Sequence, residues 1–204
     1  MFFTPGTHKD HGLPHNPFKA IVAPRPIGWI STISKDGKIN LGPYSFFNAI
    51  SETPPIVGFS ASPGPNGEKD SLINARDTGC FVVNIVSKAQ IDGMNASSAA
   101  LPHGQSEFDY AGLEPIASNG IAAPRVKDAP CQLECEIWKI LELPPAPNGA
   151  SNHWVMGLVT GIHIDDRYIV DGKLDVALYN PVSRLGYKDY AMVENLFELE
   201  RPKS

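Results

Sequence analysis

Cysteine is scarce in this chain, with three residues among 204. Because an odd and small number of cysteines does not form a disulfide framework, we expect a reducing, cytoplasmic compartment. Cys131 and Cys135 alternate with Gln132 and Glu134 along an apolar run, and Cys80 opens another apolar run. This pattern is typical of small side chains buried in strands, so we predict no metal site at these cysteines.

The chain also lacks a long apolar span and a charged-then-apolar leader, so we expect neither a membrane helix nor a signal peptide. A basic excess is missing as well, since 17 Lys and Arg face 22 Asp and Glu and the formal net charge is −5. Lys and Arg are scattered singly, which argues against a nucleic-acid binder and against a membrane-surface patch. A local cationic pocket for one small anion remains compatible with this charge pattern.

Sequence motifs of several enzyme classes are absent. There is no G-x-G-x-x-G, no Walker loop, no H-E-x-x-H and no G-x-S-x-G elbow, so dinucleotide, phosphate-loop, zinc-protease and serine-hydrolase sites of those types are not supported. His8, His11 and His15 lie close together in a Gly- and Pro-rich segment. Solvated side chains and metal ligation are both open alternatives for these histidines, and we predict no metal.

Proline and glycine, by contrast, are abundant, with 19 and 18 residues that divide the chain into short, β-rich runs. The predicted strands are Ala20–Ala23, Ile27–Ile33, Ile56–Ala61, Cys80–Val86, Cys131–Leu143 and His153–Ile164. Asp36-Gly37 predicts a hairpin turn, and helices are expected over Asp70–Asp77 and Lys88–Ala99. Because strands and helices do not alternate, we expect an antiparallel barrel with helical insertions and one domain over residues 1–204. Residues 1–17 form an irregular leader and residues 185–204 a C-terminal extension in this interpretation.

The run Lys69-Asp70-Ser71 follows a Gly- and Pro-rich loop at the start of a predicted helix. The first amides of a helix have no intrahelical partners, and the helix dipole favours an anion there. Lys69 adds a positive charge and Ser71 a hydroxyl donor, which is suitable for a phosphate group. The alternative is that Asp70 or Ser71 caps the helix while Lys69 is solvated.

A second candidate segment is NLGPYSFFNAIS, in which Asn40, Ser45 and Asn48 are polar positions among aromatic residues. A flat heteroaromatic ring needs apolar faces and polar edges, and this segment offers both. Phe46 or Phe47 is a candidate to pack on such a ring or under it. The alternative is that the aromatic residues are plain core and that Asn48 fixes a turn. Arg25 lies between two prolines and either forms a surface salt bridge or reaches a cofactor phosphate.

The string from Phe18 to Ser62 resembles the flavin reductase-like family, the FMN-binding split-barrel proteins that include flavoredoxin-like members and NAD(P)H:FMN reductases. The resemblance continues through KDSLINA, FVVNIV, MNASSAALPHGQSEFDYAGL, GLVTGIHIDDRYIVDGKLD and PVSRLGYKDYA. It implies a mainly β fold, an antiparallel split β-barrel with a few helices, and a homodimer with flavin sites near the subunit interface. The cofactor-binding residues that we expect on this basis are Arg25, Trp29, Ile30, Ser31, Thr32, Pro43, Tyr44, Ser45, Phe46, Asn48, Ser60, Ser62, Lys69, Asp70, Ser71 and Arg184.

The resemblance also suggests a function, an NAD(P)H-dependent reductase that passes hydride to FMN. Reductases of this family often carry Gly-Asp-His where this chain has Ser151-Asn152-His153, so the histidine is kept and the acid is an amide. His153 is the candidate catalytic residue beside the nicotinamide, and a strand-end histidine bonded to backbone is its alternative. An FMN-binding electron carrier, reduced by a protein donor without a nicotinamide site, is the second hypothesis, and a flavin-free dimeric scaffold is the third. A flavin-dependent monooxygenase or another electron acceptor is the expected partner.

Overall fold

The computed structural model describes residues 1–65 and 67–202. The helical elements are η1 (His8–His11), α1 (Phe18–Ile21), α2 (Asp70–Thr78), η2 (Lys88–Gln90), α3 (Ile91–Ala96), α4 (Glu107–Ala111), η3 (Asp166–Tyr168) and α5 (Val176–Tyr179). The strands are β1 (Arg25–Pro26), β2 (Gly28–Ile33), β3 (Ile39–Tyr44), β4 (Phe47–Glu52), β5 (Pro55–Ala61), β6 (Cys80–Ile85), β7 (Pro115–Ile116), β8 (Arg125–Val126), β9 (Cys131–Glu142), β10 (His153–Ile164), β11 (Ile169–Val170), β12 (Lys173–Leu174), β13 (Val182–Arg184) and β14 (Tyr190–Met192).

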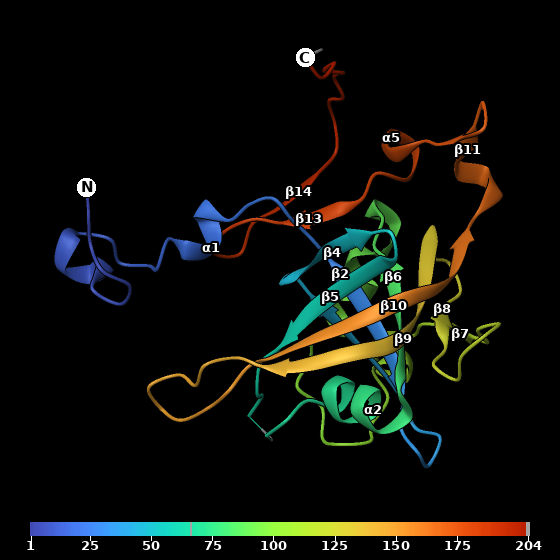
Figure 1. Ribbon diagram of the computed structural model, residues 1–204, viewed down its shortest axis with the longest axis horizontal. Coiled ribbons are helices and arrows are strands. Elements are labelled where there is room, and N and C mark those ends of the chain that lie inside the picture. The colour runs from blue at the N-terminus through green and yellow to red at the C-terminus, as the bar shows by residue number, and fades with distance from the viewer. Residues whose placement is uncertain (66, 203–204) are drawn as a thin grey trace.

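The described residues form a seven-stranded antiparallel sheet in the order β3-β2-β6-β9-β10-β5-β4. The sheet curls so that β3, at one edge, comes near β5, and α2 packs on β2 at one end of the curl (Figure 1). The fold is therefore mainly β, a curled antiparallel half-barrel with few helices, as the sequence predicted. No described helix combines the length and the apolar character needed to cross a bilayer.

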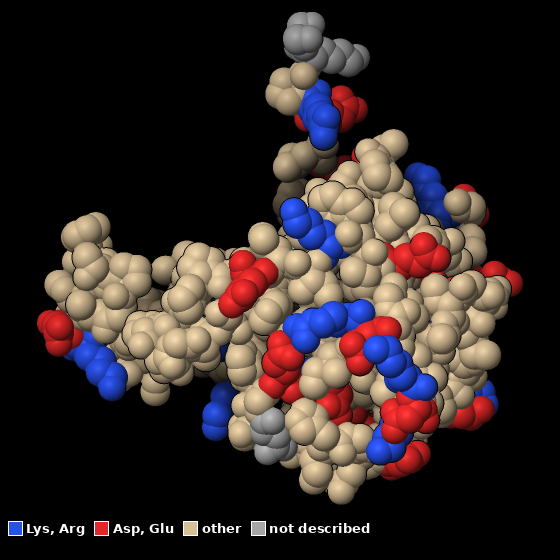
Figure 2. All heavy atoms as spheres, turned by 60° about the horizontal axis from the view of Figure 1, so that its bottom comes forward, with Lys and Arg blue, Asp and Glu red and all other residues tan. Residues whose placement is uncertain are grey.

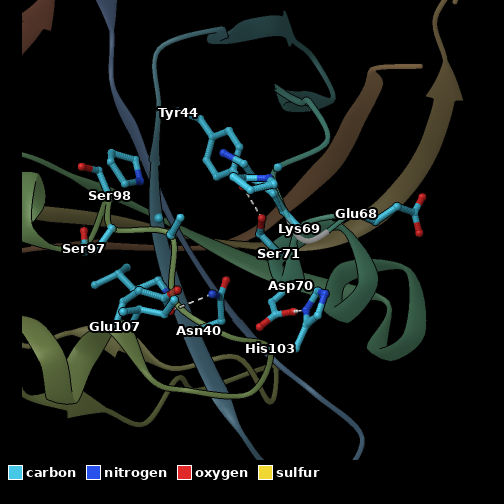
Figure 3. A pocket seen from close by; sticks show the side chains of 18 of the residues that line it. Asn40, Tyr44, Glu68, Lys69, Asp70, Ser71, Ser97, Ser98, His103 and Glu107 are labelled. Atoms are coloured by element: carbon cyan, nitrogen blue, oxygen red, sulfur yellow. Dashed lines mark hydrogen bonds and ion pairs between the residues drawn. The ribbon is translucent and has the colours of Figure 1, made fainter. Parts of the chain in front are cut away.

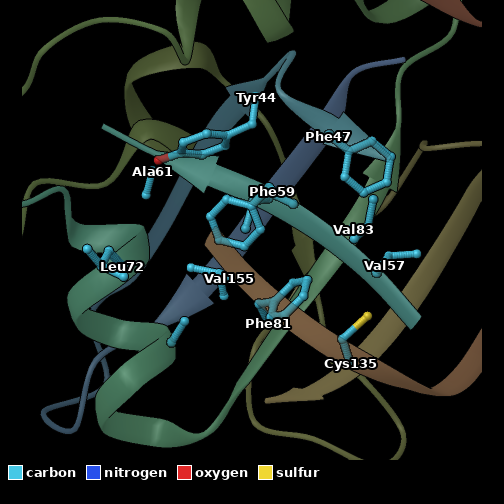
Figure 4. Close-up of a cluster of buried hydrophobic side chains, with 12 residues drawn as sticks. Tyr44, Phe47, Val57, Phe59, Ala61, Leu72, Phe81, Val83, Cys135 and Val155 are labelled. Atoms are coloured by element: carbon cyan, nitrogen blue, oxygen red, sulfur yellow. The ribbon is translucent and has the colours of Figure 1, made fainter. Parts of the chain in front are cut away.

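The inside of the curl is filled by aromatic and aliphatic side chains (Figure 4). The rings of Tyr44 and Phe59 lie 4.8 Å apart between centroids, and Phe59 meets Phe81 edge-on at 5.3 Å. Gly157 on β10 is required by this packing, because a Cβ there would lie 2.5 Å from the Phe81 ring and 2.8 Å from Cys135. The core thus holds β5, β6, β9 and β10 in close contact.

β2 is buried on both faces because a second core lies on its other side. Ile30 belongs to the core inside the curl, whereas Trp29 packs with Met94, Phe108 and Val126 beneath the helical insertions. The helices between β6 and β9 therefore cover the outer face of this strand. This packing fixes the insertion between β6 and β9, and its residue Gly104 contacts Asp70 at the start of α2.

Most of the predicted elements are confirmed. β10 has the predicted bounds, β5, β6 and β9 differ from prediction by one residue at one end, and Gly37 has the left-handed φ of 83° that the hairpin turn between β2 and β3 requires. The predicted helix over Lys88–Ala99 divides into η2 and α3.

One predicted strand is wrong. Ala20–Ala23 is not a strand, and its first two residues belong to the helical turn α1, which begins after Pro17. The buried guanidinium of Arg25 donates to the carbonyl oxygens of Lys19 and Val22, and these bonds close the turn. A short apolar run therefore folds locally instead of joining the sheet. The residues before it extend away from the body of the molecule, as does the C-terminal tail (Figure 1).

The alternation along β9 predicted the buried cysteines, and both are buried free thiols. Burial raises the pKa of the Cys135 thiol far above its ordinary value, so it stays protonated. The first part of the opposite face is buried too, because the loop over residues 117–124 covers Glu134 and Gln132 donates to the carbonyl oxygens of Val126 and Ala129. The polar side of this strand is therefore buried at Gln132 and Glu134 and reaches solvent only from Glu136 onward.

The carboxylate of Glu134 is the anchor of that loop. It accepts hydrogen bonds from the backbone N–H groups of Asn119 and Gly120, both at 2.7 Å, and contacts His163 Nε2 at 2.6 Å. Burial by itself raises the pKa of Glu134, but these hydrogen bonds outweigh burial and hold the pKa below its ordinary value. The ionised form is thus favoured in the folded chain.

We predict that Glu134→Gln lowers the free energy of unfolding by about 1–3 kcal/mol at pH 7, because it removes a charged acceptor from a buried site. Because the folded pKa lies below the ordinary value of about 4.3, the wild-type contribution is complete above that pH and is lost as the pH falls below it. Urea unfolding between pH 3 and pH 7 measures both effects. Glu136→Gln, at an exposed position two residues on, is the control, and equal stabilities of the two variants at pH 7 would contradict the assignment.

Candidate functional site

A cavity of about 400 Å³ opens at the end of the sheet where α2 begins. Three segments form its walls: the length of β3 from Asn40 to Tyr44, residues 63–65 and 67–71 leading into α2, and the segment from Ser97 to Glu107 (Figure 3). Its volume lies within the range of small-molecule and cofactor sites. The face around α2 carries Lys and Arg interspersed with Asp and Glu, without a broad field of one sign (Figure 2).

The start of α2 is open toward this cavity. Lys69 occupies the N-cap position with extended backbone, and neither it nor another described side chain caps the helix. Asp70 instead accepts a hydrogen bond from the Gly104 N–H at 3.0 Å and contacts Nδ1 of His103, while the Ser71 hydroxyl bonds to the hydroxyl of Tyr44. The alternative in which Asp70 or Ser71 caps the helix is therefore wrong, and the first-turn amides remain available for an anion.

Lys69 places a positive charge at the same point. Its Nζ lies 5.1 Å from the centroid of the Tyr44 ring, a cation–π distance. Partial burial lowers the pKa of Lys69, and an anion bound beside the ammonium group would oppose that effect. Burial raises the pKa of Tyr44 to about 12, so its hydroxyl is protonated at neutral pH and acts as a hydrogen-bond partner of Ser71.

The opposite wall carries a buried carboxylate, Glu107, at the start of α4. Its Oε2 accepts hydrogen bonds from Asn40 Nδ2 at 2.7 Å and from the Leu41 N–H at 3.1 Å. Burial raises the pKa of Glu107, with the charge of Asp70 adding to the effect, although its hydrogen bonds act in the other direction. The cavity therefore has a cationic end at Lys69 and an acidic wall at Glu107.

The structure brings together some of the residues expected from the sequence. Pro43, Tyr44, Lys69, Asp70 and Ser71 all line the cavity. Asn40, the polar residue singled out at the beginning of the same segment, lines it as well.

Four expected residues on β2 do not line this cavity. Trp29 Nε1 donates to Ser97 Oγ at 2.8 Å, and Ile30 is core. Ser31 bonds to the carbonyl oxygen of Pro124, and the Thr32 hydroxyl accepts from Asn74 Nδ2 at 3.2 Å. All four side chains are fully buried and serve internal contacts.

The residues expected around a ring lie beyond the cavity, where the chain passes from β3 to β4. Ser45 and Phe46 are half-buried in this connection, and Phe46 accepts a backbone hydrogen bond from the Ser60 N–H at 2.8 Å. Asn48 is exposed on β4, where its Oδ1 accepts from the Ala49 N–H, and Ser62 is exposed just after β5. These groups form an edge next to Tyr44 rather than part of the enclosed space.

Arg25 and Arg184 are paired across β1 and β13 and do not line the cavity. Arg25 Nη2 donates to the carbonyl oxygen of Leu185 at 2.7 Å, so its side chain joins the N-terminal turn to the C-terminal hairpin. Arg184 Nη2 donates to the carbonyl oxygen of Tyr187 at 2.6 Å within that hairpin. His153 starts β10 opposite Ala61, next to the loop that leads to α2.

The segment between Ser97 and Glu107 belongs to the resemblance, but none of its residues was among the expected site residues. His103 and Glu107 reach the cavity through contacts with residues 33 and 67 positions away. A single acid before an apolar residue, as in Glu107-Phe108, carries no local sign of burial. The local pattern here, a loop with Pro102 and Gly104 before a short helix, predicts a connecting loop but does not indicate which cavity that loop covers.

A curled antiparallel sheet with few helices, and a cavity where α2 begins, place the chain among the split β-barrel proteins. It belongs to the flavin reductase like domain family, whose sequence model matches residues 22–179.

Individual relatives agree with that assignment. An uncharacterised protein of Aquifex aeolicus is 39% identical over 173 residues, which cover 83% of this chain and 85% of the relative. Among solved structures, nitrilotriacetate monooxygenase component B from Bacillus cereus superposes with a TM-score of 0.88 at 29% identity, covering 98% of each chain. The 2-nitrobenzoate 2-nitroreductase of Pseudomonas fluorescens has a TM-score of 0.80 at 27% identity, covering 91% of this chain and 88% of the nitroreductase.

We predict that Asp70→Ala frees the 103–104 turn from α2. The Gly104 amide loses a charged acceptor, so its hydrogen exchange should accelerate by about tenfold or more, since such a bond contributes about 1.5–3 kcal/mol. Exchange followed by NMR measures this amide directly. Asp77→Ala, at an exposed position on the same helix, is the control, and unchanged protection of Gly104 in Asp70→Ala would contradict the assignment.

Proposed function

We propose that this chain binds FMN in the cavity at α2 and catalyses its reduction by NADH or NADPH. The observation that carries the proposal is the uncapped start of α2, with Lys69 beside it, on the wall of a cavity of cofactor size in a member of the flavin reductase like family. A phosphate group requires amide N–H donors and a cation, and the residues present supply both. The donor set therefore fits the phosphate end of FMN.

In this proposal Lys69, the amide groups of Asp70 and Ser71, and the Ser71 hydroxyl hold the phosphate. Tyr44 and Pro43 provide the apolar wall beside it. The connection over Ser45, Phe46 and Asn48, with Ser60 and Ser62 on the neighbouring strand, offers side chains and amides to the edge of the ring. When bound, the flavin supplies the hydride-accepting chemistry, so the protein needs no nucleophile of its own.

The work left to the chain is binding, orientation and charge stabilisation. Amide donors along residues 45–48 would stabilise the negative charge that develops at one edge of a reduced ring. His153, near the strand end that leads to the cavity loop, is proposed on the nicotinamide side.

A second function is an FMN-binding electron carrier that a protein donor reduces. The observation in its favour is Asn152, an exposed amide beside His153 where reductases of the family often carry an acid. Without that acid, His153 loses a partner that would fix its orientation, which favours a chain without a nicotinamide site.

We also propose a homodimer. Large apolar side chains are exposed on β4 and β9, with exposed fractions of 46% for Ile50, 60% for Trp138 and 45% for Leu141. Exposed apolar surface of this kind is typical of a protein–protein interface. Sedimentation at twice the mass of one chain is the expected result, and a monomer at micromolar concentration would contradict it.

A flavin-dependent monooxygenase or another electron acceptor is the proposed partner, and the buried free thiols support a cytoplasmic location.

The experiment that tests the function is anaerobic titration of the FMN-loaded protein with NADH and with NADPH, followed by visible absorption. Bleaching of the flavin spectrum by either nucleotide supports the reductase. A spectrum that persists with both nucleotides but bleaches with dithionite favours the carrier. A protein that binds no FMN contradicts both.

We predict that Lys69→Ala weakens FMN binding by about 1.5–3 kcal/mol, the contribution of a hydrogen bond to a charged group. Because the ammonium group acts on the phosphate, binding of riboflavin should change much less. Quenching of flavin fluorescence measures both affinities. Lys173→Ala, at an exposed position on β12, serves as the control, and FMN affinity of Lys69→Ala equal to that of the control would remove Lys69 from the site.

A further inference from the structure

Whereas Glu68 pairs with Arg76, Glu107 is a buried acidic group of the cavity that the proposed function leaves without a task. Its side chain belongs to a residue that is only 7% exposed, and it nevertheless lines the cavity. A buried carboxylate is costly unless hydrogen-bond donors satisfy it, because burial removes the water that would otherwise solvate the charge. The donors around Glu107 therefore indicate what kind of ligand group belongs beside it.

The donors that the protein supplies are unevenly placed. Asn40 Nδ2 and the Leu41 N–H both donate to Oε2, and Oε1 receives neither of these bonds. The backbone N–H of Glu107 itself also acts on the carboxylate. A carboxylate has about four lone-pair sites, so this group retains acceptor capacity on the side of the cavity. A ligand that offers hydroxyl donors would satisfy it, whereas a ligand that offers a phosphate there would be repelled by the carboxylate of Glu107.

The cavity is therefore polarised along β3. Glu107 is bonded at Leu41, and the Tyr44–Ser71 contact with Lys69 over the ring lies three residues further along the strand (Figure 3). Three residues of extended strand span about 10 Å. The ligand that fits has an anionic group at the Lys69 end and hydroxyl groups that reach toward Glu107. A phosphate joined to a polyhydroxylated chain has this order of groups.

We propose that Glu107 is the residue that binds the hydroxyl groups of the flavin side chain, and that Asn40 positions its carboxylate. This inference rests on the proposed function and adds a determinant of ligand choice, namely that the cavity selects flavins with a hydroxylated chain. Glu107 is a binding residue in this account and takes no part in the redox step.

Two ligands separate this role from a structural one. Riboflavin carries the hydroxylated chain without phosphate, and lumiflavin carries the same ring with a methyl group in place of the chain. Loss of the charge in Glu107→Gln should raise the riboflavin Kd about tenfold, because charge-assisted hydrogen bonds are roughly twice as strong as neutral ones, and should leave the lumiflavin Kd within twofold. Asp109→Asn, an acid-to-amide change at an exposed position of the same helix, is the matched control and should change neither value.

The pH dependence of the wild-type protein gives a second test that needs no variant. Burial raises the pKa of Glu107, and the ionised form is the better acceptor, so the ratio of riboflavin to lumiflavin affinity should rise with pH as Glu107 ionises. Glu68, Asp70, His103, Lys69 and Tyr44 also face this cavity, but they act on both ligands, so their effects largely cancel in the ratio.

The outcomes are distinct. A tenfold loss confined to riboflavin, with a ratio that rises with pH, supports the inference. Equal losses for the two ligands, or no loss for riboflavin, overturn it while leaving the flavin function standing. A wild-type protein that binds neither FMN nor riboflavin overturns the proposed function itself, and the inference with it.

Discussion

The carboxylate of Asp70 bonds to the turn at His103 and Gly104 instead of to the amides of its own helix, and the candidate site depends on this contact. The contact ties the segment from Ser97 to Glu107 to α2, which gives the cavity its third wall. It also leaves the first amides of α2 uncapped. The contacts of Asp70 thus close the cavity and leave the first amides of α2 without a side-chain partner among the described residues.

The two cores explain why this geometry is held in place. Packing inside the curl fixes Tyr44, whose hydroxyl meets Ser71 at the start of α2. The second core fixes the helical insertions through Phe108, the residue that follows Glu107. Each cavity wall is therefore attached to a packed core, so the charged groups at the cavity are positioned by apolar contacts behind them.

Local signals in the sequence predicted the elements, and long-range contacts decided the site. Period-two alternation and flanking Gly and Pro residues gave the bounds of β10 and the hairpin at Gly37, because these depend on neighbours in the chain. The hydroxyls of Ser31 and Thr32 were expected to bind the cofactor, yet in the structure they form hydrogen bonds with Pro124 and Asn74, which lie 93 and 42 residues away in the sequence. Glu107 was missed for the same reason, since its burial follows from a contact with Asn40, 67 residues distant. A single sequence carries no sign of such pairings.

The measurement that tests the account most directly is a crystal structure of the protein soaked with FMN. The account predicts the phosphate at the start of α2, within hydrogen-bond distance of the Lys69 ammonium group and the Ser71 hydroxyl. A flavin phosphate bound elsewhere, or a cavity that stays free of flavin at saturating FMN, would contradict it.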